Sequence, residues 1–189
     1  AVAYPYAGNI AGGGFMVYRK ANGDSGALDY REKAPLKASK DMYLDKNKEV
    51  IPQLSVNGAM AIGVPGTIAG VFAVHQKFGK LPLKTIMMPV IALAKKGVVI
   101  TEKQLKQINN NQKEINKISG SETMYAKTYN VGDTIKYLNL AATLERILKN
   151  GSSEFYKGET AQKMVDFIQK NGGILSMEDL SKYEVKWRK

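Results

Sequence analysis

Cysteine is absent from this sequence of 189 residues, and histidine occurs once, as His75. Disulfide scaffolds, zinc fingers, cysteine nucleophiles and metal sites with several histidines are therefore excluded within the chain. No run of about 20 apolar residues is present, so no segment is predicted to span a membrane as a helix. The first residues also lack the basic, apolar and small-residue blocks of a signal peptide, which says nothing of a longer precursor.

The chain opens on Ala1 inside an apolar stretch and closes at Lys189, directly after a strand-like segment at 183–187. We therefore expect it to be a piece of a longer protein. Its composition is typical of globular proteins, with 44% hydrophobic and 24% charged residues. A chain of this length can bury roughly 70% of its unfolded surface, so a packed core without disulfides is feasible.

Basic residues outnumber acidic ones by 28 to 17, which gives a net charge of +11. The excess lies in residues 61–120, where nine basic and two acidic side chains occupy segments predicted as helices. Arginine, whose planar group reads bases best, occurs only four times. A solvated lysine-rich surface explains this pattern better than a nucleic-acid site, and a basic module that binds anionic partners is the alternative.

The order of predicted elements indicates a mixed α/β fold. Strands are expected at 15–19 and 27–31, joined at an Asn22-Gly23 turn, and residues 32–60 are polar and irregular. Capping and breaking residues then predict five helices and a short helical turn, at 67–78, 83–96, from 101 onward, 138–149, 160–170 and from 176 onward.

Several familiar catalytic and phosphate-binding motifs are missing. The glycines at 12–14 precede a predicted strand, whereas a dinucleotide site needs the strand first, and no P-loop ending is present. We expect these glycines to let the backbone pass close to another element. His75 falls on the apolar stripe of its helix and is interpreted as a core or boundary residue, since no Gly-x-Ser-x-Gly motif supports a triad.

Two positions are candidates for binding an anion. Arg31 is expected to end the strand at 27–31, where its guanidinium could hold a carboxylate by two parallel hydrogen bonds. An ordinary ion pair with Asp29 or Glu32 explains it equally well. Val64-Pro-Gly-Thr67 places a turn at a helix start capped by Thr67, whose free N–H groups could also bind an anion, but a plain helix start is the simpler interpretation.

Five segments together resemble the γ-glutamyltranspeptidase family, also called γ-glutamyltransferase or glutathione hydrolase, of the bacterial type. They follow the family's order and approximate spacing and cover essentially the whole chain. The segments are Gly8-Asn-Ile-Ala-Gly-Gly-Gly-Phe15, Leu28-Asp-Tyr-Arg-Glu-Lys-Ala-Pro35, Gly63-Val-Pro-Gly-Thr-Ile-Ala-Gly70, Phe155-Tyr-Lys-Gly158 and Lys170-Asn-Gly-Gly-Ile-Leu-Ser-Met-Glu-Asp-Leu-Ser-Lys-Tyr183. One departure is Ala11, where the family usually has a fourth glycine.

The resemblance implies an α/β (α+β) fold: a fragment of an N-terminal-nucleophile hydrolase αββα sandwich, with a helix-rich block after a β-hairpin. Residues 1–189 would be an incomplete large-subunit portion of a single domain, with a β region at about 1–35 and a helical region at about 66–182. The precursor would cleave itself, and a threonine at the new N-terminus of the small subunit would attack the γ-glutamyl amide, with its own amine as the base.

The resemblance therefore places no catalytic residue in this chain. It implies that Arg31 binds the α-carboxylate of the glutamyl donor, with Glu32 in support. Expected partners are the small subunit of the same precursor, glutathione or another γ-glutamyl donor, and water, amino acids or peptides as acceptors. No cofactor, metal, nucleic acid or membrane span is expected, and the implied location is periplasmic or secreted. Related cephalosporin acylases and poly-γ-glutamate transpeptidases are alternatives, although the Arg-Glu pair favours an amino-acid donor.

Overall fold

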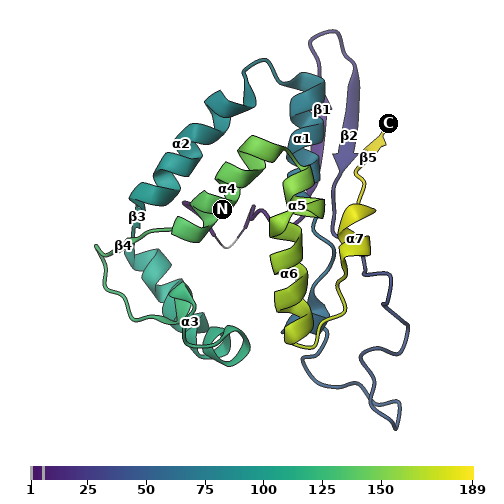
Figure 1. Ribbon diagram of the computed structural model, residues 1–189, viewed down its shortest axis with the longest axis vertical. Helices are drawn as coiled ribbons and strands as arrows, with labels where there is room; N and C mark the ends of the chain where they lie inside the picture. Colours follow the sequence, from purple (N-terminus) through teal and green to yellow (C-terminus); the bar gives the residue numbers. More distant parts are fainter. Residues whose placement is uncertain (1, 6) are drawn as a thin grey trace.

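The computed structural model describes residues 2–5 and 7–189 (Figure 1). Its main sheet has three antiparallel strands in the order β1-β2-β5, with bounds Phe15–Arg19, Ser25–Asp29 and Lys186–Arg188. The predicted strand at 15–19 is thus confirmed, and the strand-like segment predicted at 183–187 forms a strand of the same sheet that begins three residues later, at Lys186. The polypeptide returns to this sheet only at its C-terminal end, so residues far apart in sequence meet there.

The second strand begins and ends two residues before its predicted position. In the hairpin, Phe15 pairs with Asp29 and Arg19 with Ser25. The turn between them contains Gly23, whose φ of 92° suits glycine. Pairing with β1 and β5 fixes the bounds of β2, so Arg31 lies two residues beyond the strand rather than at its end. The predicted position of Arg31 within the strand was therefore wrong.

Helices make up most of the remaining chain. Two short 3₁₀ turns, η1 and η2, and a two-stranded pair, β3-β4, connect them. The α-helices are α1 (Thr67–Phe78), α2 (Leu83–Lys96), α3 (Glu102–Ser119), α4 (Leu138–Asn150), α5 (Ser153–Lys157), α6 (Glu159–Lys170) and α7 (Met177–Ser181). The smaller elements are η1 (Ala59–Ala61), β3 (Val98–Val99), η2 (Met124–Ala126) and β4 (Thr134–Ile135).

Most helix starts and ends follow the predicted capping chemistry. Helix α2 begins after Pro82 and ends at Gly97, and Thr101 caps α3 through a capping box with Gln104. The prediction for Thr67 was wrong, because this residue is the first of α1 and its side chain makes no cap hydrogen bond. The five-residue helix α5 was not predicted, since it is too short to show a helical period.

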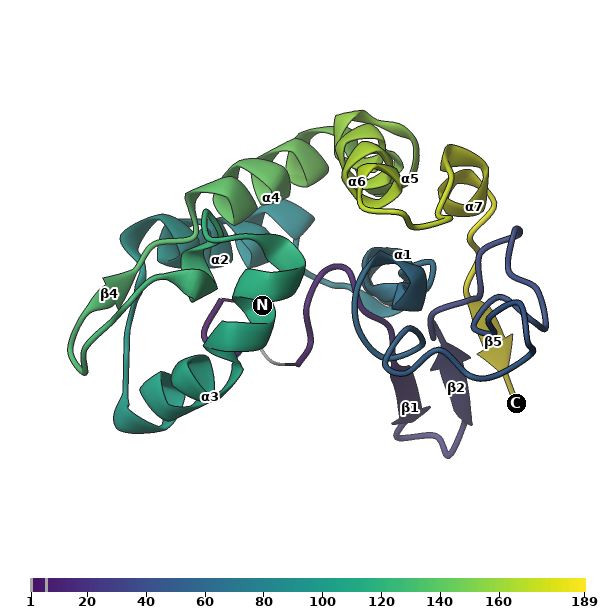
Figure 2. The same ribbon diagram turned by 90° about the horizontal axis from the view of Figure 1, so that it is seen from below.

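Two clusters of buried side chains form the core. One joins α1 to α5, α6 and α7, and the other joins α2, α3 and α4 around β3-β4. Seen from below, α1 lies between the three-stranded sheet and the group α5–α7 (Figure 2). Residues 36–58 form successive turns outside these helices and the sheet, which confirms the irregular stretch predicted there. Among the described residues, no helix is both long and apolar enough to cross a membrane.

Candidate functional site

Arg31 lies where the backbone leaves the sheet, and its side chain is 60% exposed. Its Nε donates to Glu32 Oε2 at 3.2 Å, and its Cζ lies 5.6 Å from the centre of the Phe15 ring. Within the described part of the chain, the two terminal guanidinium nitrogens have no hydrogen-bond acceptor. These two nitrogens can donate two parallel hydrogen bonds to a carboxylate.

An open depression borders Arg31. It has a volume of about 630 Å³ and lies between the segment that carries Arg31, Glu32 and Lys33 and the facing residues Tyr43 and Ile62. Tyr43 is held in that wall by a 3.1 Å hydrogen bond from its hydroxyl to the carbonyl of Met60. Arg31 and Lys33 both line the depression, with the acidic Glu32 between them in the sequence. The amine of Lys33 binds the carbonyl of Glu184, so Arg31 is the cationic group left to bind a small anionic molecule with an aliphatic part.

Glu32 is fixed by the glycine segment that precedes β1. A Cβ on Gly13 would lie 2.6 Å from Glu32 Oε2 and 2.7 Å from the backbone nitrogen of the same residue. Only glycine at position 13 therefore lets the two backbones approach this closely, which confirms the expected role for Gly13, whereas a Cβ on Gly12 would meet only an ordinary contact at 3.5 Å. The consequence is that Glu32 is held beside Arg31 by packing as well as by the ion pair.

Three backbone N–H groups at the start of α1 are bound by protein acceptors. The backbone nitrogens of Gly66 and Thr67 both donate to the carbonyl of Gly12, each at 2.9 Å. The nitrogen of Ala69 donates to the hydroxyl of Tyr156 at 3.1 Å. Because protein acceptors already bind these donors, the plain helix start is the interpretation that fits, and the anion-binding alternative is not supported.

His75 is a boundary residue, as expected. It is half-buried on α1, and its Nε2 lies 2.8 Å from the carbonyl of Leu81. A carbonyl only accepts, so Nε2 carries the proton in this contact. This hydrogen bond ties the end of α1 to the turn before α2. Within residues 2–5 and 7–189, no group of three or more His, Asp or Glu side chains is placed to hold a metal ion.

The backbone around Arg31 is held by side chains from both neighbouring segments. Its N–H donates to Asp29 Oδ1 at 3.1 Å, and its carbonyl accepts from the Tyr183 hydroxyl at 2.8 Å. Asp29 also binds Arg188 of β5 at 2.6 Å. The Arg188 hydrogen bond is the main reason that the pKa of Asp29 lies below its usual value. Asp29 is therefore already paired, so Arg31 is not its ion-pair partner.

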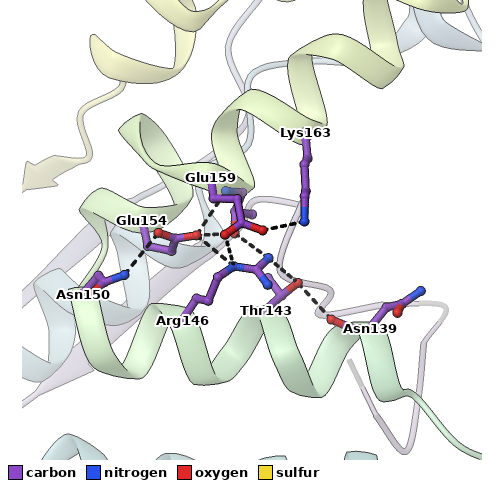
Figure 3. Close-up of polar contacts among 8 residues, drawn as sticks. Asn139, Thr143, Arg146, Asn150, Glu154, Glu159 and Lys163 are labelled. Atoms are coloured by element: carbon purple, nitrogen blue, oxygen red, sulfur yellow. Dashed lines mark hydrogen bonds and ion pairs between the residues drawn. The ribbon is translucent and has the colours of Figure 1, made fainter.

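A second group of polar side chains, between α4, α5 and α6, was not predicted from the sequence. Glu154 on α5 is 5% exposed and accepts from Arg146 Nε at 3.0 Å, from the Thr160 hydroxyl at 2.8 Å and from Asn150 at 3.3 Å (Figure 3). Glu159 lies 3.9 Å from Arg146 Nε and also pairs with Lys163. This group links α4, α5 and α6, and its closed hydrogen bonding indicates a structural role.

Comparison with known proteins places these features in a family. The profile described as Gamma-glutamyltranspeptidase matches residues 1–189. The glutathione hydrolase proenzyme of Pseudomonas aeruginosa is 44% identical over 190 residues, covering 100% of this chain and 33% of that protein. The glutathione hydrolase proenzyme of Escherichia coli is 38% identical over 188 residues, covering 97% of this chain and 32% of that protein.

Solved structures agree with the sequence comparison. The crystal structure of Helicobacter pylori gamma-glutamyltranspeptidase matches with a TM-score of 0.94 and 44% identity, over 100% of this chain and 55% of that one. A cephalosporin acylase from Bacillus halodurans matches with a TM-score of 0.81 but only 23% identity, over 98% of this chain and 36% of that one, and so shares the fold alone. The predicted fold class is thereby confirmed.

The extent of these matches identifies the family and shows what share of the relatives' length this chain covers. The chain spans about a third of the length of the curated relatives that it matches. The family profile and both curated alignments run along nearly all of its residues. This chain therefore belongs to the gamma-glutamyltranspeptidase family.

Proposed function

We propose that this chain is the N-terminal part of the large subunit of a γ-glutamyltransferase that acts as a glutathione hydrolase. The whole protein would cleave the γ-glutamyl amide of glutathione or a related donor and pass the glutamyl group to water, an amino acid or a peptide. The nucleophilic threonine would lie on the small subunit, outside residues 1–189. The relatives' names, glutathione hydrolase and proenzyme, support both the donor class and a processed precursor.

The exposed guanidinium of Arg31 carries the proposal for this part of the protein. A glutamyl donor brings a free α-carboxylate, and two parallel N–H···O bonds from one arginine match its geometry. Glu32 binds Nε, and both terminal nitrogens have no acceptor in the described part of the chain. Glu32 would thus orient the guanidinium, while Arg31 itself would hold the substrate.

Substitution of Arg31 in the full-length protein tests the proposal. Since a hydrogen-bonded charged contact contributes roughly 1.5–3 kcal/mol, Arg31→Ala should lower kcat/KM for a γ-glutamyl anilide about 10- to 150-fold. Arg31→Lys should recover part of this loss, because lysine keeps the charge but not the paired nitrogens. Unchanged donor KM and kcat/KM in Arg31→Ala would refute the assigned role.

The substrate class needs its own measurement. A glutaryl-cephalosporin keeps a carboxylate where the glutamyl donor has its α-carboxylate, but it lacks the α-amine and carries a bicyclic leaving group. The proposed enzyme should therefore hydrolyse it more slowly than the γ-glutamyl anilide, even though Arg31 could bind either carboxylate. Preferential cleavage of the cephalosporin would instead favour acylase activity. Binding of DNA or RNA that weakens steeply with added salt would favour the basic-module alternative.

We also propose a periplasmic or secreted location for the whole protein, which rests on the family resemblance. Fractionation of cells that express the full-length protein tests it, with activity expected outside the cytoplasmic fraction.

A further inference from the structure

Two residues near the C-terminal end of the chain bind the backbone of the segment that carries Arg31. The hydroxyl of Tyr183 donates to the carbonyl of Arg31 at 2.8 Å, across 152 positions of sequence. Asp179 Oδ1 accepts from the backbone nitrogen of Leu36 at 2.6 Å. Both belong to the C-terminal segment that resembles the family, and the proposed reaction leaves that segment without a role.

The hydrogen bond from Tyr183 completes the fixation of the Arg31 main chain. The Arg31 N–H binds Asp29 Oδ1, and its carbonyl binds Tyr183, so side chains hold both polar groups of this residue. Two residues further, the backbone is paired again, because Lys33 and Val64 exchange N–H···O bonds of 3.2 and 2.7 Å. The direction in which the Arg31 side chain leaves the backbone is thereby set from both sides.

Tyr183 is itself firmly held. Only 9% of it is exposed, and its ring stacks on Tyr156 at 5.7 Å with an interplanar angle of 10°. Lys33 Nζ lies 4.7 Å from the ring centre, and the same amine donates to the carbonyl of Glu184 at 2.8 Å. A Cβ on Gly66 would overlap the Tyr183 hydroxyl, so a glycine is required where α1 starts.

The hydroxyl of Tyr183 is a donor over the whole physiological pH range. Burial raises the pKa of this side chain to about 12, with the charges of Asp29 and Glu32 adding to the effect. At neutral pH the phenol therefore stays protonated and can donate to the carbonyl.

We propose that Tyr183 is a positioning residue for the carboxylate-binding arginine. It would act through the Arg31 carbonyl, without touching the substrate. A small rotation of the backbone moves a guanidinium at the end of a long side chain by a larger distance. A carboxylate contact made of two hydrogen bonds tolerates little such displacement. This inference rests on the proposed role of Arg31 and extends it to a residue of the C-terminal segment.

The test compares two donors in the full-length protein with Tyr183→Phe, which removes only the hydroxyl. The first donor is a γ-glutamyl anilide, and the second is 4-aminobutyryl anilide, which lacks the α-carboxylate. We expect kcat/KM for the first to fall about three- to tenfold, mainly through KM, as for the loss of one neutral hydrogen bond. For the second donor we expect no change, so the ratio between donors should fall.

Tyr156→Phe is the matched control. Tyr156 stacks on Tyr183 and is similarly buried. Its hydroxyl donates to the carbonyl of Pro65 at 3.0 Å and accepts from the nitrogen of Ala69 at 3.1 Å, so it makes no contact with Arg31. Loss of this hydroxyl should affect both donors alike and leave their ratio unchanged. A fall in the ratio as large as that in Tyr183→Phe would overturn the proposal, because it would indicate a general packing effect.

The remaining outcomes separate this inference from the proposed function. If Arg31→Ala lowers the donor ratio and Tyr183→Phe does not, the positioning role is wrong while the role of Arg31 stands. If Arg31→Ala leaves the ratio unchanged, the assigned role of Arg31 and the positioning role of Tyr183 are both wrong. Should Tyr183→Phe fail to give folded protein, Asp179→Ala removes the acceptor of the Leu36 N–H and so tests the same C-terminal segment. A smaller fall in the ratio is expected, and an unchanged ratio would refute positioning of Arg31 by this segment.

Discussion

Replacement of Glu154 should loosen the attachment of α4 to α5 and α6. Glu154→Ala removes the acceptor of hydrogen bonds from Arg146, Asn150 and both the backbone nitrogen and hydroxyl of Thr160. Breaking a buried ion pair costs about 3–5 kcal/mol, and the lower end applies because Arg146 is 26% exposed and can reach water. Glu154→Gln keeps an acceptor but loses the charge, which should cost about 1–2 kcal/mol.

The assay is thermal unfolding of the full-length protein. Unfolding entropy is about 2.1 cal/mol/K per residue, and the relative from P. aeruginosa is about three times as long as this chain. In a protein of roughly 570 residues that unfolds as one unit, 3 kcal/mol lowers the midpoint by about 2–3 °C. Glu159→Gln is the control, since that side chain is 52% exposed and its ion pairs should contribute little.

The effect of pH gives an independent check. Burial acts to raise the pKa of Glu154, but the hydrogen bonds from Thr160, Arg146 and Asn150 outweigh it and hold the pKa below its usual value. A carboxylate with a lowered folded pKa stabilises the protein above its unfolded pKa and loses that contribution as pH falls through the folded value. The difference between wild type and Glu154→Gln should be constant near neutral pH and should shrink below about pH 4.

One result would refute this reasoning. If Glu154→Ala and Glu159→Gln lower the midpoint equally, the buried carboxylate does not hold the three helices together. A gap between wild type and Glu154→Gln that widens in acid would likewise contradict the assigned charge state.

Two further pairs of variants test the packing around the site and in the core. Gly13→Ala should abolish folded, active protein because its Cβ would overlap Glu32. Gly12→Ala should be tolerated, since the nearest contact of its Cβ would be an ordinary 3.5 Å. Equal yields and activities of the two variants would contradict this prediction. Phe155→Ala, at 1% exposure, should cost about 3–5 kcal/mol, and Phe167→Ala, at 58% exposure, should change the thermal midpoint little; matching midpoints would show that Phe155 is not a core residue.

The sequence by itself determined features that depend on residues a few positions apart. Helix α2, Leu83–Lys96, begins after Pro82 and ends at Gly97 as predicted, because these residues set the backbone locally. The capping box at Thr101 likewise needs only the side chain of Gln104 three residues on. The ordered motifs identified the family, and they singled out Arg31 as the candidate for binding the donor.

Only the tertiary structure decided features that depend on distant partners. The bounds of β2, Ser25–Asp29, follow from its pairing with β1 and β5, and propensity alone misplaced them by two residues. The hydrogen bond from Tyr183 to Arg31 spans 152 positions, so no local pattern could predict it. A strand ends where its neighbours stop pairing, and a backbone carbonyl is bound by whichever side chain the fold brings to it.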